Sequence, residues 1–229
     1  MNSVEVYIIV EGQTEQTFVR EVLAPEMGHK GIYLYPVLIG KPGHKGGDIR
    51  FERAKEDIGK FLKQRSNTYI STMFDYSGLE TSWPGNVKTP GSHTSIEKAE
   101  RVEAATSAKI KELFPDHNVD GRFIPYIEMH EFEALLFSDA SILANKLNVN
   151  PSNIEDILDE CGDPEEIDDG PGTTPSKRLI SLDNIYRKVA MGKTISEAIG
   201  VQTIRQKCPH FSSWIAKIEQ LAVTENDSD

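Results

Sequence analysis

The sequence has no long apolar run and few cysteines, and each shortage excludes a class of protein. No stretch of eighteen or more apolar residues occurs among its 229 residues, so we expect no membrane-spanning helix. The N-terminus lacks the basic and hydrophobic regions of a secretory signal. The two cysteines, Cys161 and Cys208, have no metal-type spacing. Together these features predict a cytoplasmic protein, in which thiols stay reduced.

Positive charge is also in short supply. The chain has 25 Lys and Arg against 36 Asp and Glu, a net charge of −11. This balance argues against a protein that coats nucleic acid, because such binding requires Lys and Arg to neutralise phosphates. It does not exclude a nuclease, since carboxylates that hold divalent cations make a site acidic until the cations bind.

Apolar segments of strand length alternate with helical patterns in the first 138 residues. We predict strands at residues 4–10, 33–39, 69–74 and 122–127, and helices at residues 14–23, 49–63 and 95–114. Pro36 places the second strand at a sheet edge, and Thr14 and Ser95 are candidate helix N-caps. This alternation is typical of an α/β protein with a mostly parallel sheet flanked by helices.

The pattern changes after Ser138, where no convincing strand follows. We predict helices at residues 139–147, 151–161, 176–191, 194–199 and 211–223, interrupted by a hinge rich in Gly, Pro and Asp at residues 162–175. The chain therefore divides into an α/β core over residues 1–138 and a helical C-terminal portion over residues 139–229.

Three of the four predicted strands end in carboxylates. Glu11 follows the first strand, Asp75 the third and Glu128 the fourth, with Glu15, Glu131 and Glu133 close by in the sequence. The carboxyl ends of parallel strands meet at one sheet edge, so we expect these acids to converge. Mg²⁺ and Mn²⁺ prefer such oxygen ligands and activate water for phosphodiester hydrolysis. The alternative is that the acids are there because helix N-termini favour negative charge.

Several basic residues are candidates for contact with phosphate. Lys41 and Lys45 lie in a glycine-rich loop at residues 40–48, which either approaches a ligand or is a connector. Lys177 and Arg178 follow a helix start and reach a phosphate, a core acid or solvent. The roles of Arg187 and Lys188 stay open, as does that of His130, which is a cap, a ligand or a proton carrier. By contrast, Cys208, His210, Phe211 and Trp214 are expected to pack the last helix.

Three motifs resemble those of Toprim domains, the metal-binding module of topoisomerases, primases and OLD-type (overcoming lysogenisation defect) nucleases. The stretch VEGQTE at residues 10–15 resembles the first Toprim motif, and FDYS at residues 74–77 matches the position of the Asp-x-Asp motif. Ser77 stands where the second aspartate is expected. EFEALL at residues 131–136 is similar to a later acidic motif of OLD-type members. The resemblance implies a Toprim-like fold with Mg²⁺ or Mn²⁺ held by Glu11, Glu15, Asp75 and Glu133, and with Glu128 or Glu131 assisting.

A more particular resemblance covers nearly the whole chain. The stretches IEMHEFEAL at residues 127–135, TPSKR at residues 174–178, and CPHF at residues 208–211 followed by Trp214 look like those of an uncharacterised Toprim-like bacterial family. Its genes often lie beside ABC- or AAA-type ATPases, as in anti-phage systems. This resemblance implies an ATPase partner, and a homo-oligomer stays open.

The leading hypothesis is a Mg²⁺- or Mn²⁺-dependent nuclease that acts with an ATPase. A second hypothesis is a catalytically degraded partner or sensor subunit that docks on the ATPase, which Ser77 and the acidic surface favour. A third is a phosphotransferase or hydrolase that acts on nucleotides.

Overall fold

The computed structural model describes residues 3–40, 49–87, 94–167, 170 and 172–226. Its strands are β1 (Val4–Val10), β2 (Ile32–Leu38), β3 (Tyr69–Asp75), β4 (Phe123–Ile124) and β5 (Ile127–Glu128). The helices of the first part are α1 (Gln13–Phe18), a π-helical segment (Val19–Leu23), α2 (Ala24–Gly28), α3 (Phe51–Gln64), α4 (Ser95–Leu113) and α5 (Val119–Arg122). After a 3₁₀ segment (Phe132–Ser138) come α6 (Ala140–Leu147), α7 (Ser152–Cys161), α8 (Pro175–Leu182), α9 (Lys188–Ile199), α10 (Val201–Lys207) and α11 (Pro209–Asn226).

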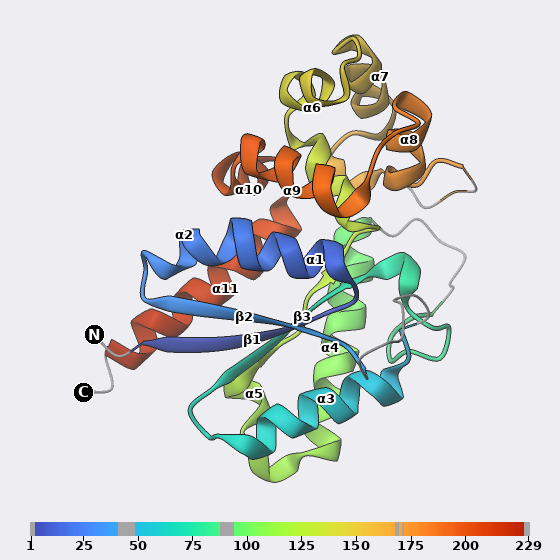
Figure 1. Ribbon diagram of the computed structural model, residues 1–229. Helices are drawn as coiled ribbons and strands as arrows, with labels where there is room; N and C mark the ends of the chain where they lie inside the picture. The colour runs from blue at the N-terminus through green and yellow to red at the C-terminus, as the bar shows by residue number, and fades with distance from the viewer. Residues whose placement is uncertain (1–2, 41–48, 88–93, 168–169, 171, 227–229) are drawn as a thin grey trace.

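The strand pairs of the described residues are all parallel, in the order β2-β1-β3-β4, and β5 also pairs with β3 (Figure 1). The predicted mixed α/β fold with a helical C-terminal part is confirmed. The bounds of β1 match the prediction. Pro36 lies in the edge strand β2, as expected. Proline has no N–H to donate to a neighbouring strand, so it is tolerated where that side of the strand has no partner strand.

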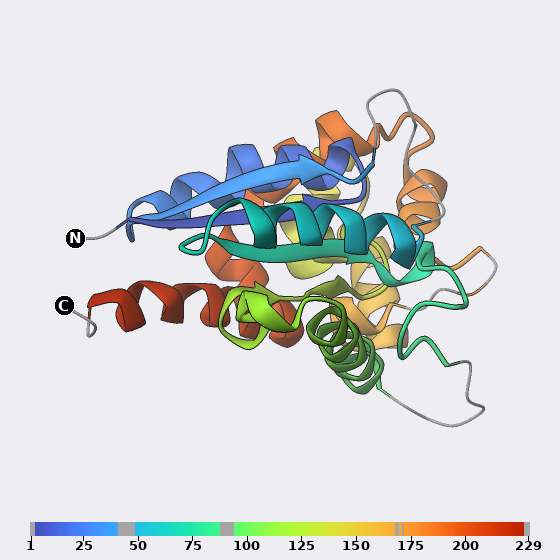
Figure 2. The same cartoon turned by 90° about the horizontal axis from the view of Figure 1, so that it is seen from below.

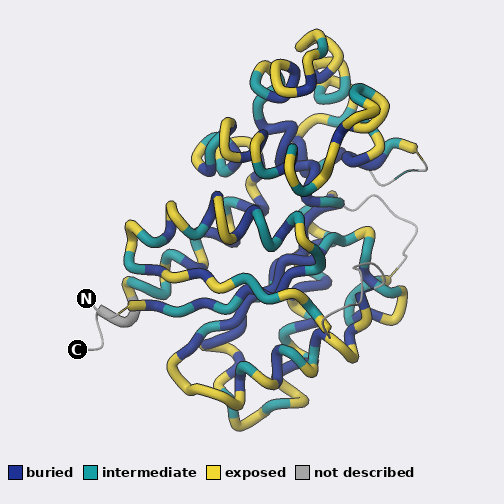
Figure 3. The backbone as a smooth tube through the Cα atoms, in the orientation of Figure 1, coloured by how far each residue is buried: buried dark blue, intermediate teal, exposed yellow. Residues whose placement is uncertain are grey.

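Two apolar layers cover the sheet on opposite faces. Helices α1 and α2 lie over one face and α3 over the other (Figures 1 and 2). Side chains of Val4, Val6 and Ile8 share an apolar cluster with α1, α2 and α11, whereas Ile9 shares one with α3 and α4. The first layer also takes in residues of α6, α9 and α10, so the helical C-terminal portion shares a core with the sheet. Buried residues accordingly run through the strands and on into the helical C-terminal portion (Figure 3).

The predicted strand at residues 122–127 is wrong in its extent. It is two short strands, separated by Pro125 and Tyr126, and Arg122 ends helix α5 instead. Side chains of β3 fill the break: Ser71 Oγ donates to Ile124 O at 2.6 Å, and Thr72 Oγ1 accepts from Tyr126 N at 3.0 Å. A proline without an N–H interrupts the ladder, and these hydroxyls satisfy backbone groups at the gap.

The helices also differ from prediction at several ends. The first begins at Gln13 with Gly12 as its N-cap, so Thr14 is not the cap, and it continues to Gly28. The N-cap of α4 is Thr94, whose hydroxyl accepts from Glu97 N, and not Ser95. The helix predicted at residues 176–191 is two helices, since α8 ends at Leu182 and α9 begins at Lys188. Helix α10 was not predicted.

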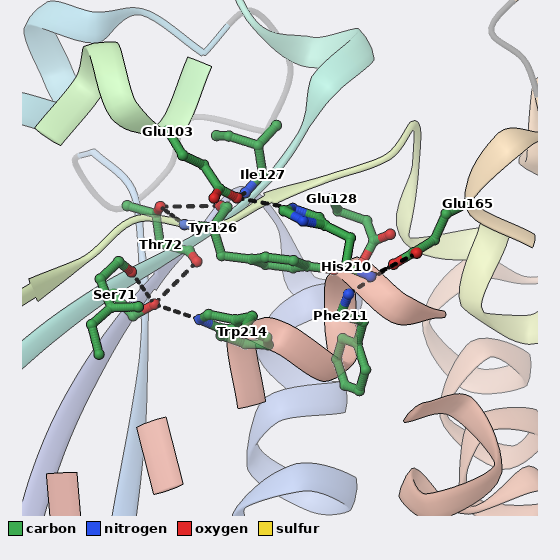
Figure 4. A network of polar contacts seen from close by, with 11 residues as sticks. Ser71, Thr72, Glu103, Tyr126, Ile127, Glu128, Glu165, His210, Phe211 and Trp214 are labelled. Carbon is green, nitrogen blue, oxygen red and sulfur yellow. Dashed lines mark hydrogen bonds and ion pairs between the residues drawn. The ribbon is translucent and has the colours of Figure 1, made fainter. Parts of the chain in front are cut away.

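A polar network anchors α11 to the sheet (Figure 4). Trp214 stacks on Tyr126 with ring centroids 4.3 Å apart, and its Nε1 donates to Ser71 Oγ at 2.8 Å. Glu165 accepts from the backbone amides of His210 and Phe211 at the start of α11, at 2.9 and 2.8 Å. As the sequence predicted, Cys208, His210, Phe211 and Trp214 are buried. In the described residues, no helix is both long and apolar enough to cross a membrane.

Replacing Trp214 by alanine is expected to lower the free energy of unfolding by about 4 kcal/mol, because it empties a buried ring site and leaves Ser71 without its indole donor. Trp214→Phe keeps a ring and loses the N–H, so it should cost less. Urea unfolding followed by circular dichroism measures both. A loss below about 1 kcal/mol for Trp214→Ala would contradict the anchoring role.

Candidate functional site

Carboxylates from separate segments meet at the C-terminal edge of the sheet. The register pairs Val10 with Met73, so Glu11 leaves β1 beside the end of β3, and Asp75 pairs directly with Glu128 of β5. The 3₁₀ segment that follows β5 brings Glu133 to the same edge, since its charge acts on Asp75. We call Glu11, Glu15, Asp75 and Glu133 the carboxylate cluster.

Glu11 is half-buried and lies against a glycine. A Cβ atom added to Gly78 would come within 2.8 Å of Glu11 Oε2, so any larger residue at position 78 would require this carboxylate to move. Among the described residues, Oε2 is buried with no hydrogen-bond donor. The pKa of Glu11 is raised to about 7, by burial first and then by the charge of Glu15. The side chain therefore changes charge near neutral pH.

Glu15 and Asp75 share the acidic surroundings of Glu11. Glu15 is buried, and its Oε2 accepts from Gly12 N at 2.8 Å, which also secures the start of α1. Asp75 Oδ1 accepts from Phe132 N at 3.0 Å. Burial raises the pKa of Asp75 well above its ordinary value, and the charges of Glu15, Glu11 and Glu133 raise it further. Charging the cluster is therefore costly in the absence of a positive partner.

Lys188, at the start of α9, supplies one positive charge. Its Nζ lies 3.3 Å from both carboxylate oxygens of the buried Glu133. The pKa of Glu133 is nevertheless raised to about 7, because burial outweighs the attraction to Lys188. Burial alone would lower the pKa of Lys188, but the charges of Glu133, Glu131 and Asp75 raise it.

The role of Lys188 was left open by the sequence because one helix was predicted across residues 176–191. The break before α9 lets this side chain begin a helix that packs on the cluster. Asp183 and Asn184, which favour turns, are the sequence signal for that break. The buried hydroxyl of Tyr186 was also missed, and the charges of Glu133 and Glu131 act on it.

The other predicted acids have structural partners. Glu131 Oε2 accepts from Ser176 N at 2.8 Å and so caps α8, although its charge still acts on Glu11 and Glu133. Glu128 is fully buried, and its Oε2 accepts from the Tyr126 hydroxyl at 2.7 Å, in the network that anchors α11 (Figure 4). His130 is buried with Nε2 3.3 Å from Ser95 Oγ.

The two predicted bases that the structure describes, Lys177 and Arg178, have other surroundings than the cluster. Lys41 and Lys45 lie outside the described residues. Lys177 is exposed, and Arg178 donates to Thr173 O and to Glu160 on α7, so it ties the hinge to the helical portion.

The donor chemistry of the cluster fits a hard divalent cation, because it offers carboxylate oxygens, two of which, Glu11 Oε2 and Glu133 Oε1, are buried without a hydrogen bond in the described residues. In the described part of the chain, however, no three His, Cys, Asp or Glu side chains stand together as a ready-made ion site. For these carboxylates to share a cation, they must turn toward one another, and Lys188 must leave Glu133.

Replacing Lys188 by methionine tests this competition. Removing the ammonium should tighten Mn²⁺ binding at pH 8 by at least about tenfold, since Lys188 neutralises part of the negative charge that would attract the cation. Titration calorimetry gives the affinity. Lys193→Met is the matched control on the same helix, because Lys193 is partly exposed and pairs with Glu197. Equal affinities for the two variants would rule out Lys188 as a competitor.

The fold and this edge define an α/β protein with a partly buried carboxylate cluster at the C-terminal end of a parallel sheet. Residues 10–219 match the protein family described as "Domain of unknown function (DUF4276)", and the chain belongs to this family. A search of the curated proteins gives no significant match. Among solved structures, the C-terminal region of the Xanthomonas campestris pv. campestris OLD protein is similar at 14% identity and a TM-score of 0.40, with 97% of each chain covered.

Proposed function

We propose that the protein is a divalent-cation-dependent phosphodiester hydrolase that cleaves nucleic acid. The observation that carries the proposal is the cluster itself: Glu11, Asp75 and Glu133 come from separate segments, and burial and mutual repulsion raise the pKa of each. Proteins bear such a cost mainly where charge is used in chemistry. The Toprim resemblance of the same residues supports Mg²⁺ or Mn²⁺ as the cation.

In this proposal, Glu11, Glu15, Asp75 and Glu133 hold the cation, which would activate water and stabilise the departing oxygen. The protein's own groups have further parts. Lys188 Nζ, released from Glu133, is free to meet a phosphate oxygen. Glu11 and Glu133, each with a pKa of about 7 in the cation-free protein, would release their protons as the cation binds. Glu131 and Glu128 hold α8 and Tyr126 in place around the cluster.

A second candidate function is that of a partner or sensor subunit that docks on an ATPase. The ion pair between Lys188 and Glu133 favours it, because this pair neutralises part of the cluster with no added cation. Ser77, which is exposed and supplies no carboxylate, also favours it. The proposed nuclease would equally act beside an ATPase, so the partner does not separate the two functions.

Cleavage assays with the purified chain separate them. We expect hydrolysis of single-stranded DNA, duplex DNA or RNA in Mn²⁺ or Mg²⁺ and none in EDTA. Glu11→Gln should abolish it, whereas Glu26→Gln on the exposed surface of α2 should not. Should the chain cleave none of these, alone or with an ATPase encoded beside it, and bind no Mn²⁺ by calorimetry, the hydrolase proposal fails and the partner role stands.

A further inference from the structure

Three aromatic rings form a row across one face of the sheet, toward its β2 edge. Tyr35 of β2 stacks on Tyr7 of β1 with ring centroids 5.2 Å apart, and Tyr7 stacks on Phe61 of α3 at 4.6 Å. Tyr33 lies near Tyr35, and these two side chains are 47% and 40% exposed. The row therefore ends in two tyrosines that face solvent beside α3.

The helix next to these rings, α3, carries an excess of basic residues, although the chain as a whole is acidic. Residues 50–65, which contain α3, have six basic and three acidic side chains, a net charge of +3 in a chain of net charge −11. The basic residues are Arg50, Arg53, Lys55, Lys60, Lys63 and Arg65. Arg65 lies near the Tyr35 hydroxyl and pairs with Glu5, whose charge acts more strongly on that hydroxyl. This local excess suits an anionic partner.

The free edge of β2 is a poor template for a protein strand. Ile39 N donates to Val10 O, so odd-numbered amides of this segment point toward β1 and even-numbered positions point outward. Pro36 is one of the outward positions, and proline has no N–H to donate. Strand addition by a partner or a second copy would therefore lack a hydrogen bond at the middle of the edge. The exposed ring faces are the recognition feature that remains.

The aromatic row approaches the carboxylate cluster at Glu11, which follows β1 on the α3 face, whereas Glu15 lies on α1 over the opposite face. Side chains alternate along β1, so Tyr7 and Ile9 point toward α3, and Glu11 continues the alternation beyond the strand. Its carboxylate lies against Gly78, next to Ile49 of the α3 layer. Four residues of strand separate Tyr7 from Glu11 by about 13 Å, comparable to about four stacked nucleotides at 3.4 Å each.

We propose that Tyr33, Tyr35 and Tyr7, together with the basic surface of α3, form a stacking platform for single-stranded nucleic acid. Unpaired bases stack on the tyrosine rings whatever their sequence, and basic side chains of α3 meet the phosphates. The strand then runs along β1 toward Glu11. The inference that single-stranded nucleic acid binds here depends only on the rings and the basic side chains. The direction of the bound nucleic acid, toward Glu11, depends on the proposed function.

Fluorescence anisotropy with a labelled oligothymidylate and a labelled duplex of equal length tests the platform, in EDTA so that no cleavage occurs. The wild-type chain should bind the single strand more tightly than the duplex. The double variant Tyr33→Ala/Tyr35→Ala should lose at least about tenfold in affinity for it, and Tyr35→Phe, which keeps the ring, should stay within about twofold. Val223→Ala is the control at an exposed apolar side chain of α11.

Several results would overturn the platform. A wild-type chain that binds no single strand refutes it, and so does a double alanine variant that binds the single strand as tightly as wild type. A double variant that changes only the oligomeric state in sedimentation would instead assign the tyrosines to contact between copies. Results that refute the platform can be told apart from results that refute the proposed function. Binding without cleavage in Mn²⁺ supports the platform and refutes the hydrolase, whereas cleavage with no effect of the tyrosines refutes only the platform.

Discussion

At pH 8, the Asp75→Asn variant is expected to be more stable than the wild-type protein and to lose its cation-dependent hydrolysis. Asparagine keeps a carbonyl oxygen that can accept from Phe132 N, so the local backbone contact is preserved. It removes a negative charge that burial and the neighbouring Glu15 and Glu11 oppose. We therefore expect a gain of about 2 kcal/mol in the free energy of unfolding.

The same substitution removes a proposed cation ligand, so hydrolysis should fall by about a thousandfold or more. Urea unfolding and the cleavage assay measure the two effects. The stability gain should shrink at pH 5, where the folded carboxyl of the wild-type protein keeps its proton. Asp159→Asn, an exposed acid of α7, should change neither property. A variant less stable than wild type at pH 8 would show that Asp75 contributes a favourable charge.

The wild-type protein should lose stability as the pH rises from 5 to 8. The pKa values of Glu11 and Glu133 are raised to about 7 in the folded protein, above their ordinary values near 4.5. The folded state therefore binds more protons than the unfolded state between these values, and its stability falls as pH rises through them. The buried Glu133 alone should account for a fall of about 3 kcal/mol.

Mn²⁺ should reverse this loss at pH 8 and have little effect at pH 5, where protons occupy the carboxylates. At a free concentration about 100 times its dissociation constant, a cation that binds only the folded state adds about 2.7 kcal/mol. Thermal unfolding with and without Mn²⁺ at both pH values measures this. In Glu11→Gln, both the pH dependence and the Mn²⁺ effect should be smaller. Stability that is flat or rising from pH 5 to 8 would contradict the raised pKa values.

The sheet and the convergence of its acids could be predicted because both follow from local sequence. β1 is an apolar, β-branched run that ends in an acid, and β3 repeats the pattern, so parallel pairing alone brings Glu11 and Asp75 to one edge. The edge position of β2 followed from Pro36 in the same way. These inferences needed no knowledge of the helices that cover the sheet.

The partners of the individual acids could not be predicted, because they depend on tertiary packing. Ser176, from a distant helix, is the donor to Glu131, and Tyr126 is the donor to Glu128. Lys188 reaches Glu133 only because the helix ends before α9 begins. The hydrophobic periodicity of the sequence does not distinguish these two helices from one long helix. Arg178, predicted to face phosphate, instead donates to Thr173 O and to Glu160 of α7, which also depends on how the helices pack. Whether any of these residues acts in catalysis stays a prediction.

A crystal structure of the protein soaked in Mn²⁺ at pH 8 tests most directly whether the buried acids exist to share a cation. We predict an anomalous peak ligated by Glu11, Asp75 and Glu133, with Lys188 Nζ moved away from Glu133. An empty cluster at saturating Mn²⁺, with Lys188 still paired to Glu133, would contradict the account.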